Sequence, residues 1–144
     1  MSTAASPTAL NRQIIDWISD TTLYKEARDF CERNPPPSNK QVKHLEGLAA
    51  SCQNWKGLID YIKHQHERET LKDCKPFYAA LWGYLDDPKK GLRKRIETEE
   101  FHRVSTEGLS KKEAKQVLDT WTQELAQEFI THLVAEAWWR QAPN

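Results

Sequence analysis

Five cationic side chains lie close together after Pro88, and they are the residues in this sequence best placed to do chemistry. They are Lys89, Lys90, Arg93, Lys94 and Arg95, with no acid among them. At about 100° per residue, the first four would cover one face of a helix. Clustered cations suit a nucleic-acid backbone, because each phosphate that they neutralise releases condensed counterions. The run therefore predicts phosphate contacts.

Gly91, within the run, has no side chain, so another stretch of backbone can approach the helix there. The acids Glu97, Glu99 and Glu100 follow the run directly. Because Glu–Arg pairs are typical of an ordinary solvated helix, the plainer interpretation, in which the cations only pair with these acids, stays open.

The whole chain of 144 residues is neutral, with 21 Lys plus Arg and 21 Asp plus Glu. This excludes a protein that binds nucleic acid through a strong overall positive field, but not one with a local basic patch. Cations exceed acids in residues 38–85 and 86–105, and acids exceed cations in 1–37 and 106–144. We expect cations of the middle segments to share a face with the run: Lys40, Lys43, Lys56, Lys63 and Arg68.

Metal and catalytic sites are not predicted. His64 and His66 are two residues apart, so on a helix they point about 200° away from each other. The three cysteines form no CxxC pair. Cys74 and His102 are a conceivable nucleophile pair, but nothing nearby predicts a lowered thiol pKa. We therefore expect no metal, no cofactor and no enzymatic activity.

The aromatic residues suggest two further roles. Tyr61 and Tyr84 are the better candidates for stacking on bases, since Trp82 lies on an apolar stripe of the core. Trp138 and Trp139 are adjacent and cannot both face one core, so one should be exposed or anchor a protein partner.

Hydrophobic periodicity predicts an all-α, single-domain bundle of six or seven helices with a long C-terminal helix. The bundle covers residues 9–144, after a flexible tail at 1–8. No apolar run approaches the roughly 20 residues of a membrane span, and the start does not resemble a signal peptide. We therefore expect a cytoplasmic protein that does not contact membranes.

Caps and prolines place the helix boundaries. The expected helices cover about residues 10–18, 23–33, 39–52, 55–69, 76–85, 88–104 and 111–140. The segment 20–22 should break the first helix from the second, and a proline corner at 34–37 joins the second to the third. Ser38 with Gln41, and Ser110 with Glu113, form capping boxes.

Three stretches carry a resemblance to a known family: Ser38–Leu45, Tyr61–Gln65 and Leu85–Lys94. The last is similar to the acidic turn and basic helix of some type I small subunits, and the first to the polar helix start of type III small subunits. The chain thus resembles the small, or belly, subunits of multi-subunit CRISPR effector complexes, with the type left open.

The resemblance implies a non-catalytic subunit that lies in several copies along a crRNA-guided complex. It would contact the other subunits, further copies of itself, and the backbone of a single-stranded target or non-target strand. Lys89, Lys90, Arg93 and Lys94 would contact phosphates, supported by Lys40 and Lys43. The alternative is a helical protein–protein adaptor with no nucleic-acid role.

Overall fold

Helices make up all the regular structure in the described part of the computed structural model, which comprises residues 12–36, 38–52, 54–68, 74–98, 101 and 107–141. The elements are α1 (Arg12–Ile18), the π-helical turn η1 (Ser19–Leu23), α2 (Tyr24–Arg33), α3 (Asn39–Ser51), α4 (Trp55–Glu67), α5 (Lys75–Asp86), α6 (Leu92–Glu97) and α7 (Lys111–Gln141). The predicted all-α bundle with a long C-terminal helix is confirmed. The expected tail at 1–8 lies outside the described residues.

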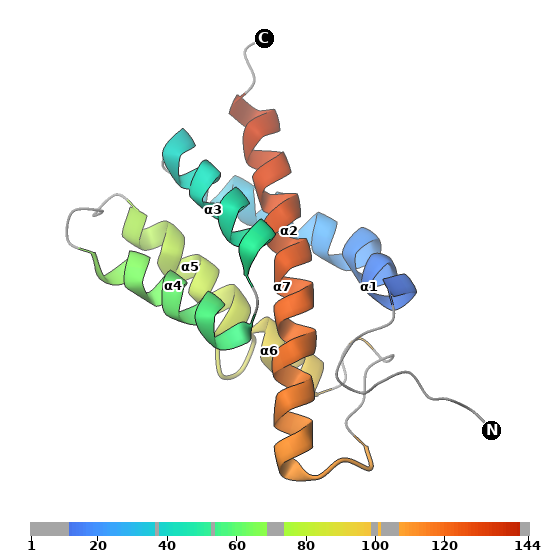
Figure 1. Ribbon diagram of the computed structural model, residues 1–144. Coiled ribbons are helices and arrows are strands. Elements are labelled where there is room, and N and C mark those ends of the chain that lie inside the picture. Colours follow the sequence, from blue (N-terminus) through green and yellow to red (C-terminus); the bar gives the residue numbers. More distant parts are fainter. Residues whose placement is uncertain are drawn as a thin grey trace.

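Helix α7 is the centre of the bundle. In Figure 1 it runs the height of the molecule, with α3, α4 and α5 on one side and α1 on the other. It packs against α2, α3, α4 and α6. Helices surround it, so its buried residues cover more than one stripe: Val117, Leu118, Trp121, Leu125, Ala126, Phe129, Ile130, Leu133, Val134 and Ala137.

The two expected capping boxes form to different extents. At the start of α7 the box is complete: the Ser110 N–H donates to Glu113 Oε1 and the Glu113 N–H donates to Ser110 Oγ, each at 3.2 Å. At the start of α3, the Ser38 side chain accepts a hydrogen bond from the Gln41 N–H, but the Gln41 side chain does not accept one from the Ser38 N–H. That side chain is buried and accepts a hydrogen bond of 2.6 Å from the Tyr78 hydroxyl.

The predicted break at residues 20–22 is wrong. Ile18 and Leu23 both have helical backbone angles, and η1 joins α1 to α2 as one helical run. The reason is tertiary contact, which overrides the low helix propensity of Asp and Thr. In η1, the Ser19 Oγ atom lies 2.6 Å from Nε2 of His132 on α7, and Leu23 is fully buried.

Glutamine side chains of α7 satisfy carbonyl groups at the end of α3. The Gln127 Nε2 donates to the Ala49 oxygen at 2.9 Å and to the Cys52 oxygen at 3.0 Å. Gln123 Nε2 donates to the Cys52 oxygen at 3.3 Å. The last carbonyls of a helix have no intrahelical donor, so these bonds hold the end of α3 against α7.

Replacing Gln127 with alanine should therefore destabilise the protein. The variant leaves the Ala49 carbonyl without its donor and the Cys52 carbonyl with Gln123 alone, at an expected cost of about 1–3 kcal/mol in the free energy of unfolding. Urea denaturation measures this cost. Gln116→Ala, at an exposed position of the same helix, is the matched control and should change stability by less than about 0.5 kcal/mol. Equal losses in both variants would contradict the proposed capping.

Candidate nucleic-acid interface

The basic run is divided between a turn and a helix. Residues 88–90 form a turn, and α6 begins only at Leu92. Lys89 and Lys90 are exposed in this turn, and their N–H groups donate to Asp87 Oδ2 at 2.9 and 2.8 Å. These two bonds lower the pKa of the Asp87 carboxyl. The expected single helix face is therefore wrong, because a turn capped by Asp87 comes before the helix.

Gly91 allows the close approach of backbone that the sequence suggests. A Cβ atom at this position would lie 2.4 Å from the Asp87 nitrogen and 2.8 Å from the Asp86 carbonyl carbon. Both distances are far shorter than van der Waals contact. Only glycine lets the chain fold back this tightly between α5 and α6.

Arg95 is bound within the protein. Its two terminal nitrogens donate to the two carboxylate oxygens of Glu26 on α2, at 2.8 and 2.9 Å. The Tyr84 hydroxyl donates to the same carboxylate at 2.6 Å, and the Tyr84 ring stacks on Phe129 at 3.8 Å between centroids. Burial, and then the charge of Glu26, raise the pKa of Tyr84 well above its ordinary value. Arg95 therefore joins helices, and Tyr84 is not a platform for stacking bases.

Two more cations of the run have acidic neighbours. Arg93 forms an ion pair with Asp119 of α7, and Lys94 forms one with Glu97 at 3.2 Å within α6. The pairing of the run with acids, which the sequence left open as the plainer interpretation, thus applies to Lys94, Arg93 and Arg95. For the two arginines the acids come from distant helices.

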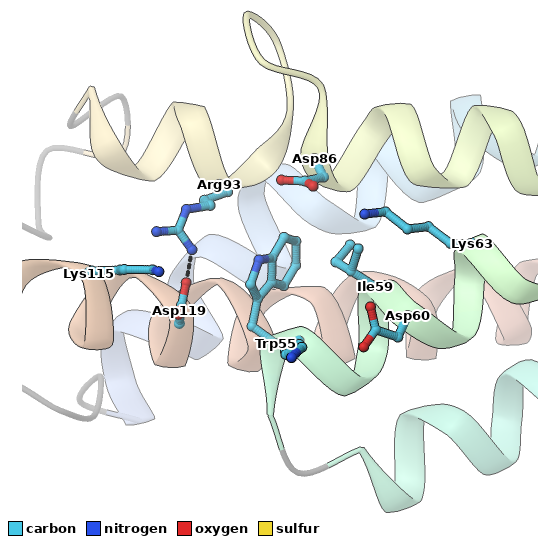
Figure 2. A pocket seen from close by; sticks show the side chains of 9 residues that line it. Trp55, Ile59, Asp60, Lys63, Asp86, Arg93, Lys115 and Asp119 are labelled. Atoms are coloured by element: carbon cyan, nitrogen blue, oxygen red, sulfur yellow. Dashed lines mark ion pairs between the residues drawn. The ribbon is translucent and has the colours of Figure 1, made fainter.

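Arg93 nevertheless points into an open cleft between α4, α6 and α7 (Figure 2). The cleft has a volume of about 430 Å³. In Figure 2 the Lys63 side chain extends from α4 toward Asp86, and the Trp55 ring lies between Lys63 and the Arg93–Asp119 pair. The residues that line the cleft are Trp55, Lys56, Ile59, Asp60, Lys63, Asp86, Arg93, Lys115 and Asp119.

The charges of the cleft favour an anion. Arg93 and Asp119 neutralise each other, which leaves the three lysines of the lining against two aspartates. Burial lowers the pKa of Arg93, opposed by the charges of Glu97 and Asp86, and a guanidinium stays protonated in proteins. Lysine ammonium groups are point charges on flexible stems, which suits them to phosphates.

Lys40 and Lys43 do not join this cleft. Both are exposed near the start of α3, and Figure 1 shows that end of α3 directed away from α6. The expected support of the basic run by Lys40 and Lys43 is therefore wrong in its geometry. Lys56 and Lys63, from the same expected group, do lie with Arg93.

Of the two adjacent tryptophans, one packs against the protein and the other is exposed, as expected. The Trp138 indole nitrogen donates to Glu46 Oε2 of α3 at 3.2 Å, and Trp138 lines an apolar hollow with Ala49 and Ala135. The Trp139 side chain, in contrast, is 76% exposed. Such an exposed indole is typical of a residue that anchors a protein partner.

In the part of the chain that the structure describes, the His and Cys side chains are not arranged as a metal site or an activated thiol. Within it, no three His, Cys, Asp or Glu side chains gather as a metal site. Burial raises the pKa of the Cys31 and Cys52 thiols, which disfavours the reactive thiolate. Cys74 is buried, and its suggested partner His102 lies outside the described residues.

No described helix is long and apolar enough to cross a membrane.

Lys115 is the cation of this surface that sequence reasoning missed. It belongs to the start of α7, and no local pattern connects it to α4 or α6. Trp82 packs against the core, as its place on an apolar stripe predicts, but it is only half-buried and also lines a hollow beside the cleft. A weak signal existed for Trp82: the adjacent Gly83 leaves that part of α5 without a covering side chain.

Comparison with known proteins adds no relative, since no protein family, curated protein or solved structure matches the chain.

Gly91→Ala should destabilise the protein, because its methyl group would overlap the backbone of Asp86 and Asp87. Overpacking of this kind costs about 1–3 kcal/mol. The matched control is Gly47→Ala in α3, where a Cβ atom meets nothing within 4 Å; it should gain about 0.5–1 kcal/mol from helix propensity. Denaturant unfolding measures both, and a stabilising Gly91→Ala would disprove the close approach.

Stability should fall in alkaline solution because of Tyr84. Its pKa is raised in the folded protein, so its contribution is complete below the ordinary tyrosine pKa of about 10 and is lost as the pH rises further. Tyr84→Phe should remove about 1.4 kcal/mol per pH unit of this decline. Urea unfolding at a series of pH values above about 9 measures the slope. An unchanged slope in the variant would show that folded Tyr84 ionises normally.

Proposed function

We propose that this protein is a non-catalytic, helical subunit that binds a nucleic-acid backbone without sequence specificity inside a larger ribonucleoprotein. The observation that carries the proposal is the convergence of three lysines from two helices, Lys56 and Lys63 of α4 and Lys115 of α7, on one open cleft (Figure 2). The small subunits of CRISPR effector complexes, which the sequence resembles, are the kind of protein that we infer. This role belongs in the cytoplasm.

The cleft supports backbone contact of modest strength. Lys56 and Lys115 are exposed and Lys63 is half-buried, so their ammonium groups can meet phosphates and release counterions. Asp60 and Asp86 line the same cleft and weaken its potential. The neutral protein therefore depends on several copies acting together for tight binding, since linked sites raise the effective concentration.

The exposed Trp139 supports the part of the proposal that concerns protein neighbours. An indole that is 76% exposed suits contact with another subunit or a further copy of this chain. The same observation favours the second candidate function, a helical adaptor that binds protein alone. The two functions differ in whether the lysines of the cleft bind a polyanion.

Binding of a fluorescent single-stranded oligonucleotide over a range of salt concentrations tests the proposal. Log K should fall with log salt at roughly −0.7 for each phosphate contacted, or about −2 for three lysines. The triple variant Lys56→Glu, Lys63→Glu, Lys115→Glu should lose at least about tenfold in affinity, since it removes these contacts and adds repulsion.

The matched control is Lys25→Glu, Lys40→Glu, Lys43→Glu, which makes the same change in charge at three exposed positions outside the cleft. It should retain affinity within about threefold, because its charges lie on other helices and are screened. Equal losses in both triple variants would overturn the cleft as the site. Absence of salt-dependent binding by the unmodified protein would favour the adaptor.

A further inference from the structure

A second hollow adjoins the cleft on the side of α5. Its volume is about 390 Å³, and it is lined by Ala79, Trp82, Gly83, Asp86, Asp87 and Pro88. Asp86 lines both this hollow and the cleft, so the two depressions meet at that residue. A ligand that lies along this surface can occupy both.

Trp82 is the aromatic residue of the hollow. The Lys63 ammonium lies over its ring, 5.1 Å from the centroid, and the His66 ring makes a T-shaped contact with it at 5.8 Å between centroids. Lys63 and His66 both belong to α4 and keep the indole in place from that side. The same Lys63 lines the cleft, so an aromatic surface and a cation for a phosphate lie side by side.

The rest of the hollow offers little for reading a base. Ala79, Gly83 and Pro88 have no polar side chains. A Cβ atom on Gly83 would meet nothing within 4 Å, which shows that the surface there is open. Asp87 Oδ2 already accepts two backbone N–H groups.

We propose that this hollow is a base-stacking subsite, in which Trp82 stacks on an unpaired base of a single-stranded nucleic acid whose neighbouring phosphate lies with Lys63 in the cleft. The inference rests on the proposed function and names its ligand more closely. Stacking is tolerant of sequence because every base has a π-face, whereas the bases of a duplex are stacked on each other and paired. The subsite therefore selects single strands without selecting their sequence.

Binding of three ligands of equal length tests the subsite: a single-stranded oligonucleotide, the same backbone with abasic sites, and a duplex. We expect the oligonucleotide to bind at least about fivefold more tightly than the abasic strand, in line with the affinity that one stacked base contributes. Trp82→Leu should reduce the affinity for the oligonucleotide to the abasic level and leave the affinity for the abasic strand unchanged.

A second variant protects the test against a folding defect in Trp82→Leu. Gly83→Leu fills the hollow from an open position and should cause the same selective loss. Gly47→Leu on α3, which is also an open position, is its control and should have no effect on binding.

The outcomes separate the two proposals. Equal binding of the oligonucleotide and the abasic strand, unaffected by Gly83→Leu, would overturn the stacking subsite and leave the backbone-binding function in place. Failure of the unmodified protein to bind any of the three ligands would overturn the function itself, and the subsite with it.

Discussion

The packing of four helices around α7 is the constraint on which the rest of the structure depends. α2, α3, α4 and α6 contact α7, so the positions of the other helices are set by the side chains that α7 presents to each. Phe129 stacks with Tyr84 of α5, Gln127 binds the end of α3, and Asp119 pairs with Arg93 of α6. The cleft exists because α4 and α6 meet α7 at neighbouring places along its length.

Ion pairs divide the cations of a neutral protein into two groups. Arg95, with Glu26, joins α6 to α2, and Arg93, with Asp119, joins α6 to α7. Arginine suits the contact with Glu26 because its planar guanidinium meets a carboxylate with two parallel bonds. Near α6 and the cleft, the exposed cations are lysines: Lys89 and Lys90 on the turn before α6, and Lys56 and Lys115 at the cleft. Arg93 and Arg95 thus hold the short helix α6 in place, and these lysines are left for an external anion.

Some local sequence signals predicted local structure, whereas the break expected at 20–22 and the second bond of the Gln41 capping box gave way to contacts with other helices. Distant pairings were beyond any local signal. Ser110 with Glu113 forms the expected box, and Gly91 allows the expected close approach of backbone. Both signals act within four residues. The Glu26–Arg95 pair spans 69 residues, and Lys115 reaches the cleft only through the course of α7. A helical periodicity places side chains on a face but does not say which helix lies opposite. The run at 89–95 was therefore recognised, but its division into pairing and exposed cations was not.

Lysine footprinting by acetylation and mass spectrometry tests most directly whether the cleft is the site that meets nucleic acid. The unmodified protein is labelled with and without a single-stranded oligonucleotide, and the labelling of each lysine is compared. We expect the oligonucleotide to protect Lys56, Lys63 and Lys115, and to leave Lys40 and Lys43 on α3 labelled as before. Protection of Lys40 and Lys43 with no protection in the cleft would contradict the site derived from the structure.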